Sequence, residues 1–493
     1  MKRSHLAAFF LPLASLCTPA FAQSPSPSPQ PLSPQNKLLR EIYQELIEIN
    51  TTDSVGSCTE AAKAMAARLK TGGYTDAEMQ LIVPPGGPKK GNLVARLKGS
   101  GARKPLMLLA HIDVVEARRE DWERDPFKLV EEGGFFYARG SSDDKSQAAI
   151  FVSNMIRYKQ ERIAFGQEKL ASSFVPARDI ILALTCDEEH GESKFNGVVY
   201  LIKRHRHLID AEITLTEGGG GSLDKNGKPV LHGIQAGEKI YQSFQLEVTN
   251  IGGHSSVPEK NNAITHLADG LSRLGKFEFP FKLSDTTRAY FERRAALEAP
   301  AAPAIAADMR AILRLPPSPP DRDALARLYA VNPFYNASVR TTCVATMLDA
   351  GHAENALPQR AKAVVNCRIL PGGKVADVQA TLARVMADDQ IKITTIDKTT
   401  EAPVPPLTPE LLKAVEAITA DMWPGIPVIP MMSSGATDGR FLNNAGIWTY
   451  GITGSFSYPE GSHAHGLNEK LPVKSLYDAH EFQYRLGKRL AGG

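Results

Sequence analysis

The chain has 493 residues, of which 43% are hydrophobic and 23% are charged, as is ordinary for a globular protein. This length exceeds what one compact core usually holds, so we expect two domains, one inserted into the other. A formal net charge of +3 without a basic stripe argues against a nucleic-acid partner.

The N-terminus has the pattern of a signal peptide. Lys2 and Arg3 precede an apolar stretch at 6–16, and Ala20-Phe21-Ala22 is a suitable cleavage site. The apolar stretch is too short to span a membrane. We therefore predict a signal peptide at 1–22, export to the periplasm or the medium, and a Pro/Ser-rich linker at 23–36.

An alternation of helices and apolar strands follows the linker. Helices are expected at 38–49, 59–70 and 148–157, and short apolar strands at 92–97, 105–109, 179–185 and 211–215. This alternation predicts an α/β domain with a mixed sheet covered by helices on both faces. In such sheets the reactive groups lie in loops just past the strand ends.

The pattern changes near residue 239. Alternating apolar and polar residues predict half-exposed strands, interleaved with two helices; the strands are at 242–248, 339–348, 361–370 and 391–396, and the helices at 263–274 and 375–388. We interpret 239–400 as an inserted α+β lid domain, with 277–333 as an extension of it. A helix at 407–422 and a strand at 447–450 return the chain to the first domain, which would comprise 37–238 and 401–493.

Four cysteines remain after the signal peptide: Cys58, Cys186, Cys343 and Cys367. Their spacing matches no zinc ribbon. A disulfide between Cys343 and Cys367 is conceivable on neighbouring strands. We favour the alternative, that all four are small buried apolar residues.

Five short motifs carry candidate chemistry; four of them lie at strand ends of the α/β domain, and the fifth follows the insertion. They are His111-Ile112-Asp113, Arg139 to Lys145, Asp187-Glu188-Glu189, Glu217 with four following glycines, and His463 to Glu469. Each alone has an ordinary explanation, such as a structural histidine, a helix cap, an acidic turn or a flexible loop. Together, imidazoles and carboxylates are typical ligands of Zn, Co or Mn in hydrolytic sites.

The order HxD, RGxxDDK, DEExG, EGGGG, GGHSS, NxR and HGxNE resembles the M20 metallopeptidase family, over about residues 37–490. That family includes glutamate carboxypeptidases, aminoacylases and dipeptidases. The long insertion is similar to that of its carboxypeptidase and N-acyl-amino-acid hydrolase branch. The resemblance implies two Zn²⁺ ions, with Co²⁺ or Mn²⁺ as alternatives, and a homodimer formed through the lid.

The resemblance also implies a role for each motif residue. His111, Asp143 and Glu217 would hold one metal, and Asp143, Glu189 and His465 the other. Glu188 would be the general base and acid, and Asp113 would orient His111. In the lid, His254 would stabilise the oxyanion, in relatives often from the partner subunit. Arg368 would bind the substrate carboxylate with help from Asn355, and Gly435 would belong to a loop on the substrate side.

The sequence thus predicts a secreted hydrolase that cleaves a peptide or amide bond next to a free carboxylate. An N-acyl-amino-acid deacylase and a dipeptidase or aminopeptidase are alternatives with the same chemistry. A peptide-binding protein that kept only the fold is a more remote alternative, because such a protein should have lost ligands.

Overall fold

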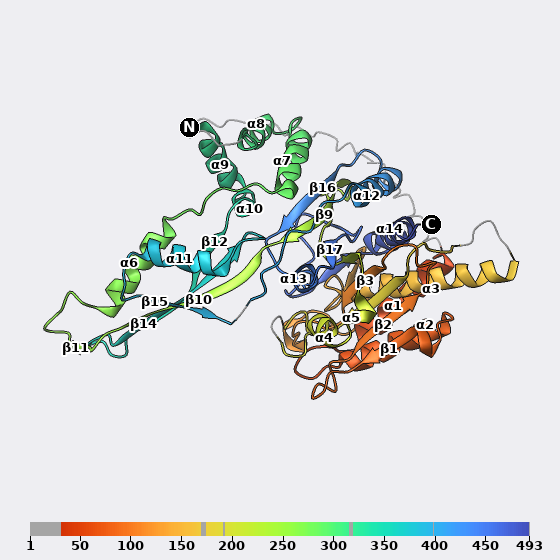
Figure 1. Ribbon diagram of the computed structural model, residues 1–493, viewed down its shortest axis with the longest axis horizontal. Coiled ribbons are helices and arrows are strands. Elements are labelled where there is room, and N and C mark those ends of the chain that lie inside the picture. Colours follow the sequence, from red (N-terminus) through yellow and green to blue (C-terminus); the bar gives the residue numbers. More distant parts are fainter. Residues whose placement is uncertain (1–30, 169–173, 191–192, 315–318, 398, 493) are drawn as a thin grey trace, which may run out of the picture.

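The computed structural model describes residues 31–168, 174–190, 193–314, 319–397 and 399–492. It shows an α/β body from which an elongated arm extends (Figure 1). The predicted signal peptide and residues 23–30 lie outside the described residues. The last part of the predicted linker is helical, because α1 (Pro34–Glu48) begins after Ser33, whose side chain accepts a hydrogen bond from the Asn36 N–H at 3.2 Å.

A mixed ten-stranded sheet forms the α/β body, in the order β1-β2-β6-β3-β7-β17-β9-β8-β18, with β16 also paired to β9. Strands β6, β3, β7 and β17 run parallel at its centre. The strands are β1 (Met79–Ile82), β2 (Asn92–Leu97), β3 (Leu106–His111), β6 (Ile180–Thr185), β7 (Ile213–Thr216), β8 (Gly220–Leu223), β9 (Pro229–Glu238), β16 (Val428–Ser433), β17 (Trp448–Gly451) and β18 (Phe456–Ser457).

Helices cover both faces of this sheet, as predicted. Alternate residues of β3 point to opposite faces. Leu106 and Leu108 pack in a core with α1, α2 (Cys58–Thr71), α3 (Lys145–Glu168), α12 (Pro409–Met422) and α14 (Val473–Leu490). On the other face, Met107 and Leu109 pack with α4 (Gly197–Arg204), α5 (Arg206–Ile209) and α13 (Gly439–Asn444).

A small second sheet ties the C-terminal part of the chain to the turn before α3. It has the order β19-β5-β4, from β4 (Val130–Glu132), β5 (Phe135–Tyr137) and β19 (Lys470–Pro472). The pairing of β5 with β19 brings the segment after Tyr137 next to the segment before Lys470. Two of the predicted motifs lie in these segments.

The arm is the lid, and its four-stranded antiparallel sheet has the order β12-β14-β10-β15. The chain enters it at β10 (Ile240–Thr249) and passes through β12 (Thr342–Ala350) and β14 (Arg360–Ile369) to β15 (Lys392–Ile396). Helices α6 (Ala263–Gly275) and α11 (Val375–Met386) pack on one face, around Phe244, Val365 and Leu382. A two-stranded pair, β11 (Gly253–His254) with β13 (Ala356–Leu357), forms the end of the arm that lies furthest from the α/β body (Figure 1).

The helices between α6 and β12 pack differently from our interpretation of 277–333 as part of the lid. They are α7 (Asp285–Glu298), α8 (Pro303–Ile312), α9 (Pro319–Val331) and α10 (Pro333–Ala337). Phe291 and Met309 share a core with Leu231 of β9 and Ile429 of β16. These helices therefore cover the end of the large sheet rather than the lid sheet.

Two disulfides link the four cysteines, Cys58 with Cys186 and Cys343 with Cys367, so the favoured interpretation as free buried thiols is wrong. Cys343 and Cys367 face each other directly on β12 and β14. The other pair joins the start of α2 to the residue after β6, 128 positions apart in sequence. No local pattern could have paired these two residues.

No helix in the described ranges is both long enough and apolar enough to cross a membrane.

Candidate metal centre

Three parallel strands end side by side at one edge of the large sheet. His111 is the last residue of β3, and it lies opposite Thr185, the last residue of β6. Strand β7 ends at Thr216 on the other side of β3. The residues that follow these ends, Glu188 and Glu189 after β6 and Glu217 after β7, therefore converge on His111.

Asp143 lies between the two predicted metal-binding histidines. One carboxylate oxygen, Oδ1, is 3.1 Å from Nε2 of His111, and the other, Oδ2, is 3.1 Å from Nε2 of His465. Nε2 of His465 is also 2.9 Å from Oε2 of Glu189, and Nε2 of His111 is 3.9 Å from Oε1 of Glu217. All five predicted ligands thus lie together, and Asp143 has the position expected of a bridging carboxylate.

Potential ligand atoms also cluster tightly. Those of His111, Asp143 and Glu189 lie within 4.8 Å of one another, and so do those of His111, Glu188 and Glu217. Two imidazoles with several carboxylates suit Zn²⁺ and similar divalent ions. The donor set therefore fits a metal centre.

The electrostatics of this cluster also favour bound cations. Burial, with the nearby charge of Glu188, raises the pKa of Glu217 well above its ordinary value. Burial also raises the pKa of Glu188, and the charges of Asp438 and Glu189 add to the effect. Hydrogen bonds that His465 donates to Asp143 and Glu189 raise the pKa of His465 to about 10. Carboxylates this close repel one another, and a divalent cation would offset the repulsion.

Asp113 contacts both His111 and the acidic turn, Asp187-Glu188-Glu189. Its backbone oxygen is 3.1 Å from Nδ1 of His111, and its carboxylate oxygen Oδ1 is 3.5 Å away. The same carboxylate accepts hydrogen bonds from the N–H groups of Glu188, at 3.3 Å, and Glu189, at 3.1 Å. Asp113 therefore fixes the imidazole and the two glutamates relative to each other.

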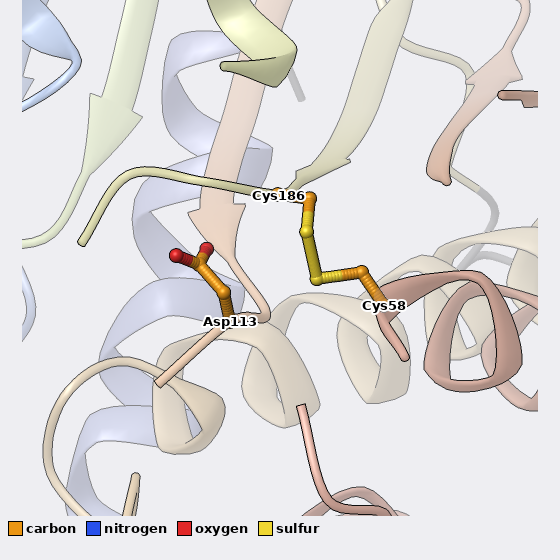
Figure 2. A group of neighbouring side chains, drawn as sticks. All are labelled: Cys58, Asp113 and Cys186. Carbon is orange, nitrogen blue, oxygen red and sulfur yellow. A yellow bond between two sulfur atoms is a disulfide. The ribbon is translucent and has the colours of Figure 1, made fainter. Parts of the chain in front are cut away.

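A disulfide lies beside Asp113. Figure 2 shows Cys58 joined to Cys186, with the Asp113 carboxylate close to Cys186. These three residues also form a group with metal-binding potential, but both sulfur atoms are already used in the disulfide. Because Cys186 directly precedes the acidic turn, the disulfide anchors this turn to α2.

Glu469 is a functional residue that we did not single out from the sequence. It is fully buried, and its carboxylate accepts hydrogen bonds from Arg139 Nη1 at 2.8 Å and from the N–H groups of Gly140, Ser142 and Asp143 at 3.0, 2.7 and 3.0 Å. It thus clamps the turn that carries Asp143 to the loop that carries His465. Its place at the end of the last motif was the available signal.

Arg368 and Gly435 lie together where the lid meets the α/β body. Arg368 Nη1 is 3.4 Å from the backbone oxygen of Ser434, and its guanidinium lies 4.7 Å from the centre of the Tyr241 ring. The loop after Gly435 continues to Asp438, whose Oδ1 accepts a hydrogen bond at 2.7 Å from Asn196. Asn196 also donates to the backbone oxygen of Asp187, so this loop reaches the acidic turn of the metal centre.

His254 and Asn355 do not join these residues within one chain. His254 pairs with Ala356, and the Ser255 N–H donates to the Asn355 oxygen at 3.1 Å, which places both predicted residues at the far end of the lid. Arg360 and Arg368 are separated by roughly 27 Å along β14, because a strand rises about 3.4 Å per residue. The expectation that Asn355 helps Arg368 bind one carboxylate therefore fails within a single chain.

The α/β body with histidines and carboxylates at its strand ends defines a metal-dependent hydrolase class. The chain belongs to peptidase family M20/M25/M40, whose model matches residues 107–489. It is a metallopeptidase or amidohydrolase of this family.

The relatives carry names that point to different substrates. The chain is 28% identical to N-fatty-acyl-amino acid synthase/hydrolase PM20D1 of Homo sapiens, over 78% of this chain and 73% of that protein. It is also 28% identical to probable carboxypeptidase S-like 2 of Dictyostelium discoideum, over 80% and 74%. An M20 metallo-carboxypeptidase from Sulfolobus solfataricus has the same fold, with a TM-score of 0.64 at 18% identity, covering 93% of this chain and all of that one.

Proposed function

We propose that the protein is an exported di-zinc hydrolase that cleaves the peptide or amide bond next to a free C-terminal carboxylate. The observation that carries this proposal is the position of Asp143 between His111 and His465, with Arg368 at the junction of the lid and the α/β body. Relatives named as a carboxypeptidase and as an N-acyl-amino-acid hydrolase support a substrate with a free carboxylate.

His111 and Glu217 would hold one zinc ion, Glu189 and His465 the other, and Asp143 both. When bound, such a pair of ions polarises the scissile carbonyl and lowers the pKa of a water molecule. Asp113 keeps the imidazole of His111 oriented, and Glu469 holds the turn of Asp143 next to the loop of His465. Co²⁺ or Mn²⁺ would suit the same ligands.

Glu188 is suited to be the general base and acid. It lies among the ligands, and its burial raises its pKa, which favours holding a proton during the reaction. Its carboxylate would take a proton from the attacking water and deliver it to the leaving nitrogen. A Glu188→Ala variant should keep its metals and lose activity by about 10²- to 10⁴-fold. Normal turnover in a metal-loaded variant would disprove this role.

Arg368 would bind the substrate carboxylate. A guanidinium can form two parallel hydrogen bonds with a carboxylate, which gives both affinity and orientation. Tyr241 and Ser434 hold the guanidinium near Gly435, on the loop that reaches the acidic turn. The arrangement favours substrates that end in a carboxylate over substrates that begin with a free amine.

His254 would act in the active site of a partner subunit. It lies at the far end of the lid in its own chain, and β12 is an edge strand of the lid sheet. Val344, Met347 and Leu348 of β12 are 60, 67 and 66% exposed. An exposed apolar edge strand is suited to pair with another strand. We therefore propose a homodimer formed through the lids.

Export is supported by the predicted signal peptide and by the two disulfides. Disulfides persist mainly in oxidising compartments such as the periplasm or the medium. Detection of the chain in the periplasmic or secreted fraction, with an N-terminus at Gln23, would support this part. Retention of the uncleaved chain in the cytoplasm would contradict it.

Matched substrates test the function directly. The zinc-loaded protein would be assayed with dipeptides that are N-acylated and have a free C-terminus, and with dipeptides that are C-amidated and have a free N-terminus. Cleavage of the first set alone supports the proposal. Cleavage of the second set alone would point to an aminopeptidase and overturn the role of Arg368. The position of the bond cleaved in the first set separates a carboxypeptidase from a deacylase.

A further inference from the structure

Lys239 is a buried cation between β9 and β10, at the point where the chain enters the lid. The residue is only 1% exposed. Its ammonium donates a hydrogen bond to the Thr342 hydroxyl at 3.2 Å, and its backbone N–H donates to the Ser433 oxygen at 3.0 Å. In the described part of the chain, no carboxylate forms an ion pair with it. A buried ammonium without an anionic partner is costly and is seldom only structural.

Arg368 lies close enough to Lys239 for its charge to act on the ammonium. Thr342, which accepts the hydrogen bond from Lys239, is directly opposite Arg368 in the pairing of β12 with β14. Residues directly opposite each other point to the same face of a sheet. Burial and the charge of Arg368 lower the pKa of Lys239 to about 7. Arg368 likewise forms no ion pair with any residue that the structure describes.

The segment Ser433–Ser434 contacts the backbone of Lys239 and the guanidinium of Arg368. The Ser433 oxygen receives the Lys239 N–H, and the Ser434 oxygen receives Nη1 of Arg368 at 3.4 Å. Two neighbouring positive charges repel each other. An anion bound between them would attract both and offset this repulsion. Since neither cation has an anionic partner among the described residues, the anion would come from outside the chain.

We propose that Lys239 and Thr342 are the second half of the carboxylate site of Arg368. The oxygen of Thr342 accepts from Lys239, so its O–H is directed away from the ammonium and can donate to a carboxylate held by Arg368. Lys239 is then a positioning residue that acts through Thr342 and adds positive charge behind it. This inference rests on the proposed function, because it assumes that Arg368 binds the substrate carboxylate.

The test compares an N-acyl amino acid with the same compound as a C-terminal amide, using the full zinc-loaded protein. For Lys239→Met and for Thr342→Val we expect the acid-to-amide ratio of kcat/KM to fall about tenfold, as for loss of one charge-assisted hydrogen bond. The loss should appear in KM for the acid rather than in kcat. Lys239→Arg should recover most of the ratio. Lys276→Met, a change of an exposed lid lysine, is the matched control.

Arg368→Met in the same assay separates this inference from the proposed function. If Arg368→Met lowers the ratio but Lys239→Met and Thr342→Val lower acid and amide cleavage equally, the inference is wrong and the proposed function stands. If Arg368→Met also leaves the ratio unchanged, carboxylate recognition by Arg368 fails, and the inference fails with it. Because Thr342→Val only replaces the hydroxyl with a methyl group of similar size, it decides the matter even if Lys239→Met does not fold.

Discussion

The metal centre and the lid differ in how the fold brings their predicted functional residues together. At the metal centre, the key side chains lie at a strand end, shortly after one or in a tight turn, and parallel strand ends bring His111, Glu189 and Glu217 together in one chain. In the lid, Arg368 lies in the four-stranded sheet beside the α/β body, whereas His254 lies in the separate pair of β11 with β13 at the far end of the arm. The comparison shows that the predicted metal ligands come together within one chain, whereas the proposed role of His254 requires a second chain.

Of the substitutions considered, Asp143→Asn should impair the metal centre most strongly. The neutral amide cannot bridge two cations as a carboxylate does, so we expect loss of bound zinc and a fall in kcat of about a thousandfold or more. Metal analysis of the purified variant and steady-state kinetics measure both effects. Asp76→Asn, at an acid on the surface of the same body, should change neither. A zinc-loaded and active Asp143→Asn protein would refute the bridging role.

Dimers that combine two different variants test the role of His254 in the lid. His254→Ala should lower kcat about 10²- to 10³-fold, as expected for loss of an oxyanion donor. If His254 acts in the partner's site, mixing inactive His254→Ala and Asp143→Asn chains should restore activity, because one site in each mixed dimer is then intact. Absence of recovery in mixed dimers verified by mass spectrometry would indicate that His254 does not act across the interface.

Glu469→Gln tests how the metal-centre loops are held. The change removes the charge that faces Arg139 and weakens the hydrogen bonds to the turn of Asp143. We expect zinc affinity to fall about 10- to 100-fold, as for other groups that orient ligands. Competition with a chelator measures it, and Glu460→Gln, at an exposed acid, serves as the control. Unchanged affinity would show that the clamp is dispensable.

His232 makes the stability of the α/β body depend on pH. Burial lowers its pKa to about 3, so the folded state resists a proton that the unfolded state accepts below about pH 6.5. Stability is therefore present above pH 6.5 and is lost as the pH falls toward 3. When the pH is lowered from 7 to 5, the unfolding free energy of His232→Gln should fall by up to about 2 kcal/mol less than that of the wild type. Urea unfolding measures this, with exposed His352→Gln as control; equal losses would contradict it.

Much of the α/β body could be predicted from the sequence because its strands are short, apolar and local. The strand at 92–97 has the predicted bounds, and His111, Glu188 and Glu217 are near the strand ends where the motifs place them. The helices α7 to α10 were misplaced because their Ala- and Pro-rich segment has no pattern that selects its packing surface. The disulfides and the separation of Asn355 from Arg368 depend on long-range pairing and register, which one sequence does not reveal.

The number of metal ions per chain tests the central claim most directly. The metal-free protein would be titrated with Zn²⁺ while bound metal and dipeptide hydrolysis are both measured. The account predicts two zinc ions per wild-type chain, with full activity only after the second, and a reduced number for His465→Ala. One ion per chain with full activity would contradict a two-metal centre built on Asp143.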